Sequence, residues 1–292
     1  MAALTEKHIE ALLEPLLPDG EFSPQHLKTL RKMGAQRRAV VLAFPPKAAG
    51  TFLRSAIIKA VDGQLVRVVH ALGGRDATPY LPTFVEYFVG GVTEKTLVTH
   101  IHMLGLPANL HFLSAFGIRP IIIKRNIPDM LASYWDMLDS DADALRHGLN
   151  CPIPGDFRNW SRNNKADFMV DILGQWYVKY YASWLGLAQS NPAAVCVVDY
   201  AELKDDPVGV LQRCLAFVGL ERPHSECEQA VNYAWDRREA LRFNKGVEGR
   251  GQTYFRSAHL NRLSRMMSYY PVPEAYRGEL LESSRALKRK RA

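Results

Sequence analysis

Short, continuously apolar runs alternate with longer mixed segments along most of the chain. The run 39–44 is entirely apolar, which is typical of a strand buried on both faces of a parallel sheet. Further strands are predicted at 65–69, 96–101, 119–124 and 194–198. The mixed segments are predicted to be helices, at 51–61, 81–89, 107–116, 128–138, 166–189, 207–218 and 225–235.

Strands that alternate with helices predict an α/β fold in one domain, whose central parallel sheet is flanked by helices on both faces. We place this domain at 38–275, after a helical segment at 1–37 that packs on it and before a basic tail at 276–292. Residues 140–165 are rich in Asp, Asn, Pro and Gly, a composition that favours a loop or an insertion.

Composition limits where the protein is expected to act. The chain has 292 residues, of which 47% are hydrophobic, an ordinary value for a globular protein with a core. No apolar run approaches the roughly 18 residues of a membrane span, and residues 1–10 lack the apolar core of a signal peptide. We therefore expect a cytoplasmic protein with no membrane span.

The net charge of +7 indicates an anionic partner, such as a small polyanion, an acidic membrane or nucleic acid. Part of the excess lies at 288–291, which we interpret as a solvated end rather than a nucleic-acid patch. The four cysteines form no C-x-x-C pair, so we expect buried free thiols instead of disulfides or metal ligands. No acidic cluster indicates a metal site.

A candidate anion-binding loop joins the first predicted strand to the following helix, with the sequence F-P-P-K-A-A-G-T-F-L at 44–53. Small residues let the backbone approach an anion, and free N–H groups at a helix start bind phosphate. Lys47 adds a charge and Thr51 a hydroxyl group. Because Lys47 precedes the glycine, the loop is P-loop-like but is not a Walker A motif. On the loop alone, an ordinary turn with an incidental lysine stays equally open.

Further segments give the loop a family context. The residues P-K-A-A-G-T-F at 46–52 resemble the P-K-x-G-T-T-W and P-K-x-A-G-T loops of sulfotransferases that use 3′-phosphoadenosine 5′-phosphosulfate (PAPS), which grip the 5′-phosphosulfate. The segment 121–134 resembles that family's R-N-P-x-D-x-x-x-S-Y segment, with one additional residue before Pro128. The resemblance implies that Arg125 and Ser133 bind the 3′-phosphate. Arg125 also ends a predicted strand, where ligands lie in open α/β sheets, and a guanidinium matches phosphate bidentately.

Two later segments extend the resemblance over roughly 40–256. The segment 198–207 resembles the family's Y-E-D-L-K-x-D-P stretch, and 243–252 resembles its R-K-G-x-x-G-D-W loop, although Asn244 replaces the first basic residue and Arg250 is available as a substitute cation. Trp235 lies where the family often stacks an aromatic ring on adenine, while a core role for it stays open. The implied cofactor-binding residues are Lys47, Ala48, Ala49, Gly50, Thr51, Phe52, Arg125, Ser133, Tyr200, Trp235, Lys245 and Gly246.

The resemblance implies in-line transfer of a sulfuryl group from PAPS to a hydroxyl or amine, which leaves 3′-phosphoadenosine 5′-phosphate (PAP) and requires no metal. Lys47 would stabilise the leaving phosphate. The segment 96–103 resembles the family's K-[ST]-H-L strand end, so His100 is the implied general base, and the usual lysine is replaced by Val98. His102 would lie on the same strand face, so spacing alone does not choose between the two histidines.

Two other functions stay open on the residues alone. A P-loop kinase or NTPase would need Mg²⁺ ligands, yet the strand at 119–124 runs into a basic residue. A non-catalytic module could bind a polyanion through a basic face.

For an enzyme we expect a small-molecule or glycan acceptor and no nucleic acid, and the sequence does not indicate an oligomeric state. Aromatic residues favour an apolar or ring-bearing acceptor alcohol, namely Tyr80, Phe84, Tyr87, Phe88, Phe157 and Trp160.

Overall fold

A five-stranded sheet with the order β2-β3-β1-β4-β5 forms the centre of the molecule, and every neighbouring pair of strands is parallel. The computed structural model describes residues 23–25, 28, 30–32, 39–69, 78–84, 95–140, 151–237 and 248–282. The strands are β1 (Ala39–Leu42), β2 (Gln64–Val66), β3 (Leu97–His100), β4 (Ile121–Lys124) and β5 (Cys196–Asp199). The predicted α/β fold with a parallel central sheet is confirmed.

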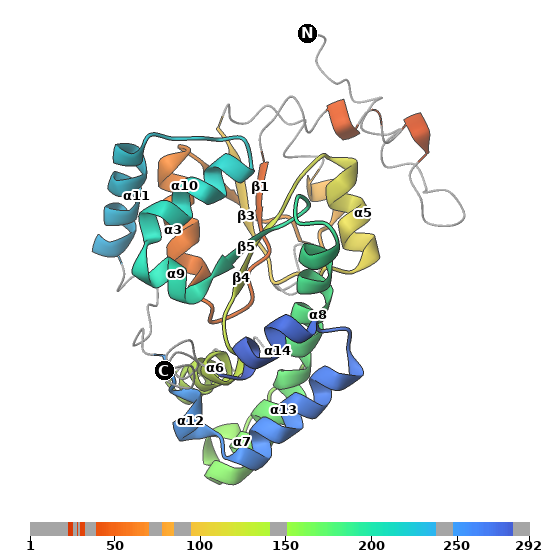
Figure 1. Ribbon diagram of the computed structural model, residues 1–292, viewed down its shortest axis with the longest axis vertical. Coiled ribbons are helices and arrows are strands. Elements are labelled where there is room, and N and C mark those ends of the chain that lie inside the picture. Colours follow the sequence, from red (N-terminus) through yellow and green to blue (C-terminus); the bar gives the residue numbers. More distant parts are fainter. Residues whose placement is uncertain are drawn as a thin grey trace.

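Helices cover both faces of this sheet, as predicted (Figure 1). Helices α3 (Gly50–Ala60), α10 (Pro207–Phe217) and α11 (His224–Asp236) lie on one face, and α5 (Pro107–Ala115) and α8 (Gly174–Ser190) lie on the other. Strands β1, β3 and β4 are almost entirely buried, which explains why their sequences are continuous apolar runs instead of alternating ones.

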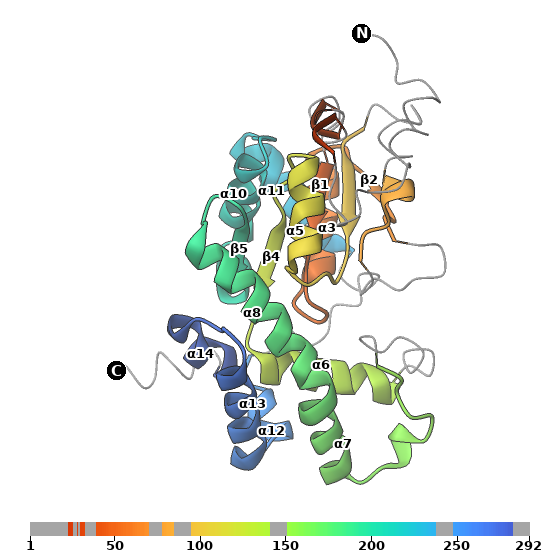
Figure 2. The same ribbon diagram turned by 90° about the vertical axis from the view of Figure 1, so that its right-hand side faces the viewer.

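A second group of helices lies beyond the carboxyl ends of the strands (Figures 1 and 2). The group comprises α6 (Ile127–Ser140), α7 (Arg162–Phe168), α12 (Gly251–Tyr254), α13 (Ser257–Tyr269) and α14 (Glu274–Leu281), while the short α9 (Tyr200–Asp205) follows β5 directly. Lys124 at the end of β4 forms ion pairs with Asp199 of β5 and Glu279 of α14. These pairs attach α14 to the end of the sheet.

The long helix predicted at 166–189 is interrupted. Residues Met169–Leu173 form a π turn (η3) between α7 and α8. A π turn contains one more residue than an α turn, and apolar periodicity is too coarse to reveal one extra residue. Strand ends also differ, since the run predicted at 65–69 pairs as a strand over Gln64–Val66 alone although Val68 and Val69 are buried.

Several predicted segments lie wholly or partly outside the described residues. The predicted helix at 81–89 is helical over 81–84, and its remainder lies outside them. Residues 1–22, residues 141–150 of the predicted insertion and residues 283–292 of the basic tail also lie outside the described residues. Among the residues that the structure describes, no helix has the length and apolar character that a membrane crossing requires.

Candidate active site

The loop between β1 and α3 has an unusual backbone. Lys47 and Ala49 lie in the left-handed region, with φ of 64° and 65°, and Ala49 is the N-cap of α3. Such a conformation costs roughly 1–2 kcal/mol for a residue other than glycine. The next residue, Gly50, packs directly on Phe44, and a Cβ atom there would lie 2.6 Å from a carbon of the Phe44 ring. The surrounding structure must therefore stabilise this loop.

The buried Tyr177 and the half-buried Arg125 hold the loop on either side of the Lys47 backbone. The Tyr177 hydroxyl donates a hydrogen bond to the Pro46 carbonyl over 3.1 Å. Arg125 Nη1 donates to the Lys47 carbonyl over 2.6 Å. The Lys47 ammonium lies 3.8 Å from Sδ of Met137 on α6. The predicted phosphate-loop lysine is thus placed between the sheet edge and α6.

Arg125 lies directly after β4 and contacts a second predicted site residue. Its guanidinium carbon lies 4.0 Å from the centre of the Tyr200 ring, at the start of α9. Its Nε atom is buried and has no hydrogen-bond partner among the described residues. The structure therefore brings Lys47, Arg125 and Tyr200 together, and the Arg125 guanidinium keeps one buried N–H group available to an anion.

Helix α8 connects the ends of three strands through aromatic side chains on one face, a feature that sequence reasoning missed. The Tyr180 hydroxyl donates to the Ala43 carbonyl after β1, and the Trp184 indole donates to the Met103 carbonyl after β3 over 2.8 Å. The Tyr181 hydroxyl donates a hydrogen bond to the backbone carbonyl of Ile123 in β4 over 3.3 Å. It accepts one from the backbone amide of Arg125 over 2.9 Å.

These hydroxyl groups are reliable donors. Burial raises the pKa of Tyr177, Tyr180 and Tyr181 above the usual value, so each stays protonated at neutral pH. Together with Trp184 they occupy positions i, i+3, i+4 and i+7 on α8, which place them on one helix face. That spacing is visible in the sequence, but their hydrogen-bond partners are not.

Both histidines of the predicted base segment lie at the end of β3. Their rings are 5.1 Å apart and nearly perpendicular. His100 is 9% exposed and its Nδ1 lies 3.5 Å from Nη1 of Arg54 on α3, whereas Nδ1 of His102 lies 2.6 Å from the Phe44 carbonyl. Val98, at the position of the usual lysine, is fully buried in the sheet.

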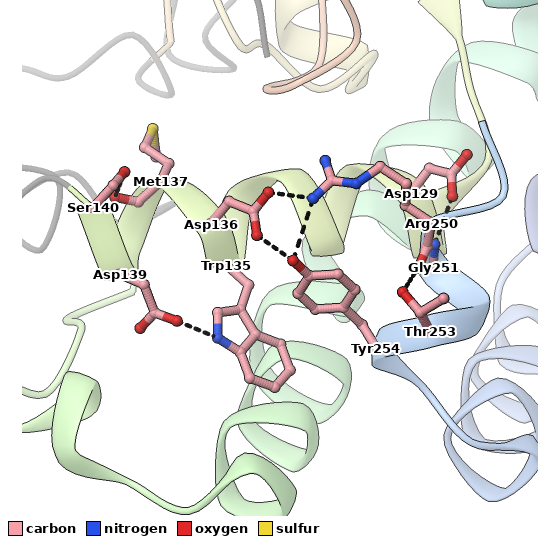
Figure 3. Close-up of polar contacts among 10 residues, drawn as sticks. All are labelled: Asp129, Trp135, Asp136, Met137, Asp139, Ser140, Arg250, Gly251, Thr253 and Tyr254. Carbon is pink, nitrogen blue, oxygen red and sulfur yellow. Dashed lines mark hydrogen bonds and ion pairs between the residues drawn. The ribbon is translucent and has the colours of Figure 1, made fainter. Parts of the chain in front are cut away.

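Helix α6 holds the segment that follows the predicted K-G loop (Figure 3). The Asp129 carboxylate, which is 2% exposed, accepts hydrogen bonds from the amides of Gly249 and Gly251, each over 2.8 Å. It also accepts from Nδ2 of Asn126 over 2.9 Å. Lys245 and Gly246, the predicted phosphate contacts of that loop, lie outside the described residues.

Arg250 contacts helix α6 through its side chain. Its guanidinium forms an ion pair with Asp136 of α6, and the Tyr254 hydroxyl donates to the same carboxylate. Burial is the largest single influence and lowers the pKa of Arg250, but the hydrogen bonds and charges of Asp136 and Tyr254 together raise this pKa overall. Arg250 therefore joins α12 to α6, and its use as a substitute cation for the cofactor stays a prediction.

The remaining predicted cofactor residues lie on elements around the loop. Phe52 and Trp235 form a ring pair with centres 4.8 Å apart, which joins the start of α3 to the end of α11. Ser133 is buried on α6, one turn after Asp129. Ala48 is buried, and Thr51 is partly buried in the first turn of α3.

Most of the described aromatic residues predicted to line an acceptor pocket fill cores instead. Phe84 packs against Phe112 and Phe116. Phe157 packs against Trp160 and Phe168 and is fully buried. Tyr80 is exposed, and two further candidates at 87 and 88 lie outside the described residues. Phe84, Phe157 and Trp160 are therefore no evidence for a ring-bearing acceptor.

Comparison with known proteins assigns the family. A family model described as "Sulfotransferase domain" matches residues 74–245, more than half of the chain. The chain belongs to the sulfotransferase family. The match begins after the phosphate loop and includes the residues after β3 and β4 discussed above. Within the described part of the chain, no group of three or more His, Cys, Asp or Glu residues could hold a metal ion.

Individual relatives agree with this assignment. "Sulfotransferase 1A1" of Bos taurus is 26% identical over 53% of this chain and 48% of its own length. "Cytosolic sulfotransferase 13" of Arabidopsis thaliana is 26% identical over 75% of this chain and 63% of its own length. The matched part of this chain thus spans about half to just under two thirds of the length of these relatives.

Solved structures share the fold. The mouse sulfotransferase SULT7A1 complexed with PAP has a TM-score of 0.61 at 17% identity, covering 91% of this chain and 94% of that chain. A retinol dehydratase in complex with androsterone and inactive cofactor PAP has a TM-score of 0.51 at 12% identity, with 85% of each chain covered. At these identities the likeness shows the fold of the chain alone.

Proposed function

We propose that this sulfotransferase family member transfers the sulfuryl group of PAPS to a hydroxyl or amine of a small-molecule acceptor and releases PAP. The observation that carries the proposal is the convergence of Lys47, Arg125 and Tyr200 at the carboxyl edge of the sheet. Ligands of open α/β sheets bind at this edge. The family assignment and the PAP named with two of the similar folds support the same cofactor.

Each part of the site has a task in this proposal. The amides at the start of α3 and the Lys47 ammonium bind the 5′-phosphosulfate and stabilise charge on the leaving phosphate. Arg125 and Ser133 bind the 3′-phosphate, together with Lys245 and Gly246. Tyr200 stacks on one side of Arg125, and Phe52 and Trp235 offer aromatic rings to adenine.

The substrate hydroxyl that receives the sulfuryl group must lose its proton to a base. That base must lie at the carboxyl edge of the sheet, near the sulfur of the donor. The two histidines at the end of β3 are candidates for this role. Sulfuryl transfer resembles phosphoryl transfer in depending on in-line positioning and electrostatics. We propose a hydroxyl-bearing small molecule as the acceptor, the class to which the androsterone bound by one similar fold belongs.

Binding of PAP without metal tests the cofactor. We expect isothermal titration calorimetry in EDTA to detect PAP binding, and PAP to raise the melting temperature by mass action. ATP with Mg²⁺ and an oligonucleotide serve as matched anionic controls. Tight ATP–Mg²⁺ binding without PAP binding would favour a kinase, and preference for the oligonucleotide would favour a polyanion-binding module.

Transfer itself is tested with labelled PAPS over phenols, aliphatic alcohols, sterols, amines and glycans. We expect a labelled sulfate ester or sulfamate with at least one acceptor and stoichiometric formation of PAP. A protein that binds PAP tightly but transfers sulfate to no acceptor class would contradict the enzymatic part of the proposal.

A further inference from the structure

The two peptide groups that flank Lys47 are each held by a side chain from outside the loop. The Tyr177 hydroxyl of α8 donates to the Pro46 carbonyl over 3.1 Å, and Arg125 donates to the Lys47 carbonyl over 2.6 Å. Peptide groups are planar, so rotation about N–Cα of Lys47 turns the first group and rotation about Cα–C turns the second. The two bonds therefore restrain both backbone dihedral angles of Lys47.

The conformation held in this way is one that a lysine avoids by itself. Lys47 has a φ of 64° and Ala49 a φ of 65°, both in the left-handed region, whereas Ala48 between them lies outside that region. A Cβ atom disfavours left-handed backbone, so contacts from outside the loop must stabilise it. Loss of the Tyr177 bond would favour a return of Lys47 to the ordinary right-handed or extended regions.

The alternation of backbone hand over residues 47–49 has a chemical use. Successive residues of opposite hand direct neighbouring backbone N–H groups into one concavity, which binds anions. The Pro46–Lys47 peptide bond is trans, so its carbonyl and its N–H group point in opposite directions. Because the Pro46 carbonyl faces Tyr177, the Lys47 amide points away from that hydroxyl. Tyr177 thus sets the direction of one N–H group of the concavity.

The surroundings of Tyr177 suit it to this task. Its side chain is fully buried, and its ring packs edge-on against Trp176 with centres 5.3 Å apart. Burial raises the pKa of the hydroxyl well above the usual value, so the group stays a donor at neutral pH. Tyr180 and Trp184 of the same helix bond to the ends of β1 and β3. The donor is therefore fixed relative to the sheet and does not move with the loop.

We propose that Tyr177 is a positioning residue of this sulfotransferase, whose hydroxyl acts with Arg125 to hold Lys47 in the left-handed conformation that binds the 5′-phosphosulfate. The proposal rests on the proposed function. Tyr177 acts through the backbone of the loop, because its hydroxyl bonds to the Pro46 carbonyl. The hydroxyl should therefore affect binding of the 5′-phosphate of a ligand and leave binding of the 3′-phosphate unchanged.

Nucleotides with and without a 5′-phosphate test this expectation. Tyr177→Phe removes the hydroxyl and keeps the ring. Tyr180→Phe is the matched control, since that hydroxyl is equally buried and donates to the Ala43 carbonyl before the loop. In calorimetry we expect Tyr177→Phe to weaken PAP binding by roughly 3- to 15-fold, the equivalent of one hydrogen bond. Its affinity for adenosine 3′-phosphate should stay unchanged, and Tyr180→Phe should keep both affinities.

Thermal unfolding separates positioning from stability. Each variant leaves one buried carbonyl without its donor, so we expect both melting temperatures to fall. A loss of PAP affinity confined to Tyr177→Phe then cannot result from lowered stability. Equal weakening of PAP and adenosine 3′-phosphate in Tyr177→Phe, equal loss of PAP affinity in the two variants, or unchanged PAP affinity in both would overturn the proposal.

A double-mutant cycle tests the backbone argument directly. Glycine adopts left-handed backbone without the cost of a Cβ atom, so Lys47→Gly should remove the need for the Tyr177 hydroxyl. We expect Tyr177→Phe to weaken PAP binding in the wild-type background and to have no further effect in the Lys47→Gly background. An equal loss in both backgrounds would mean that Tyr177 does not act through the conformation of Lys47.

The failure of this proposal differs from the failure of the proposed function. A wild-type protein that binds PAP, together with variants that show none of these differences, would overturn the role of Tyr177 alone. A wild-type protein that does not bind PAP would contradict the proposed function, and the role of Tyr177 with it.

Discussion

At the scale of single residues, Arg125 contacts both halves of the proposed cofactor site. Its guanidinium bonds the phosphate-loop carbonyl of Lys47 and keeps a buried Nε–H group for an anion. The residue therefore affects the 3′-phosphate directly and the 5′-phosphosulfate through the loop. Ligands that differ in the 3′-phosphate alone can separate these two effects.

We expect Arg125→Ala to weaken PAPS binding more than binding of adenosine 5′-phosphosulfate, which lacks the 3′-phosphate. The difference should be about 1.5–3 kcal/mol, the value of a charged hydrogen bond, or roughly one to two decades in affinity. Calorimetry with both nucleotides checks this. Equal losses would mean that Arg125 acts on the loop alone.

Gly50 is a residue whose lack of a side chain the structure requires. An added Cβ would lie 2.6 Å from a Phe44 ring carbon and 2.9 Å from the Phe44 Cβ. We expect Gly50→Ala to lower the free energy of unfolding by roughly 1–3 kcal/mol, as overpacking does.

The control for Gly50 is Gly278 of α14, where an added Cβ would meet no atom within 4 Å. Gly278→Ala should raise the free energy of unfolding by up to about 1 kcal/mol, since alanine favours helices. Urea unfolding measures both variants. A similar change in the two would contradict the packing argument at Gly50.

At the scale of elements, α6 is connected to the segment 249–254 through Asp129 and Asp136 (Figure 3). The Asp129 carboxylate uses both oxygens to accept backbone amides. An asparagine would present an NH₂ group to one of those amides, which leaves a buried donor without an acceptor. The connection is therefore specific for the carboxylate.

We expect Asp129→Asn to destabilise the protein by roughly 1–3 kcal/mol and to reduce PAP affinity, because the segment directly follows the proposed phosphate contacts Lys245 and Gly246. Asp205→Asn, at an exposed position of α9, is the control. Thermal unfolding and calorimetry measure the two effects. Unchanged PAP affinity would show that the anchor supports the fold alone.

Helices α7 and α13 are joined by a charged pair whose strength depends on pH. The hydrogen bond from Arg262 lowers the pKa of Asp167 below its usual value. A carboxylate with a lowered pKa stabilises the folded state above its unfolded pKa of about 3.9 and loses that contribution as pH falls through the folded pKa.

We therefore expect Asp167→Asn to be less stable than the wild type at pH 7 and the difference to shrink steadily below about pH 4. Denaturant unfolding at several pH values measures this difference. A constant or growing difference at acid pH would contradict the assignment of the interaction to the ionised carboxylate.

At the scale of the whole molecule, local patterns predicted more of the fold than of the site. Apolar runs and the segments between them predicted the parallel sheet, because buried strands and crossover helices have distinct local sequences. Helices α9 and α12 to α14 were missed, although α13 has apolar residues at helical spacing, and the π turn was read as regular helix. One extra residue in a π turn changes apolar periodicity too little to be visible.

The site was predictable where it consists of a strand, a turn and a helix that follow each other in the chain. Lys47 and Arg125 belong to such segments, and both converge as expected. Contacts between distant segments were not predictable, such as that of Arg250 with Asp136, 114 residues away. Their partners depend on how α6 and α12 pack, which no short motif encodes.

The π turn at Met169–Leu173 sets the rotational phase of α7 relative to α8. Removing one residue there would restore a regular helix and rotate one side by about 100°. Bonds to the ends of three strands fix α8, so the rotation would fall on α7 and separate Lys165 from Asp139. We expect deletion of Ile172 to lower the melting temperature and preserve PAP affinity, whereas loss of PAP affinity would mean that α8 turns instead.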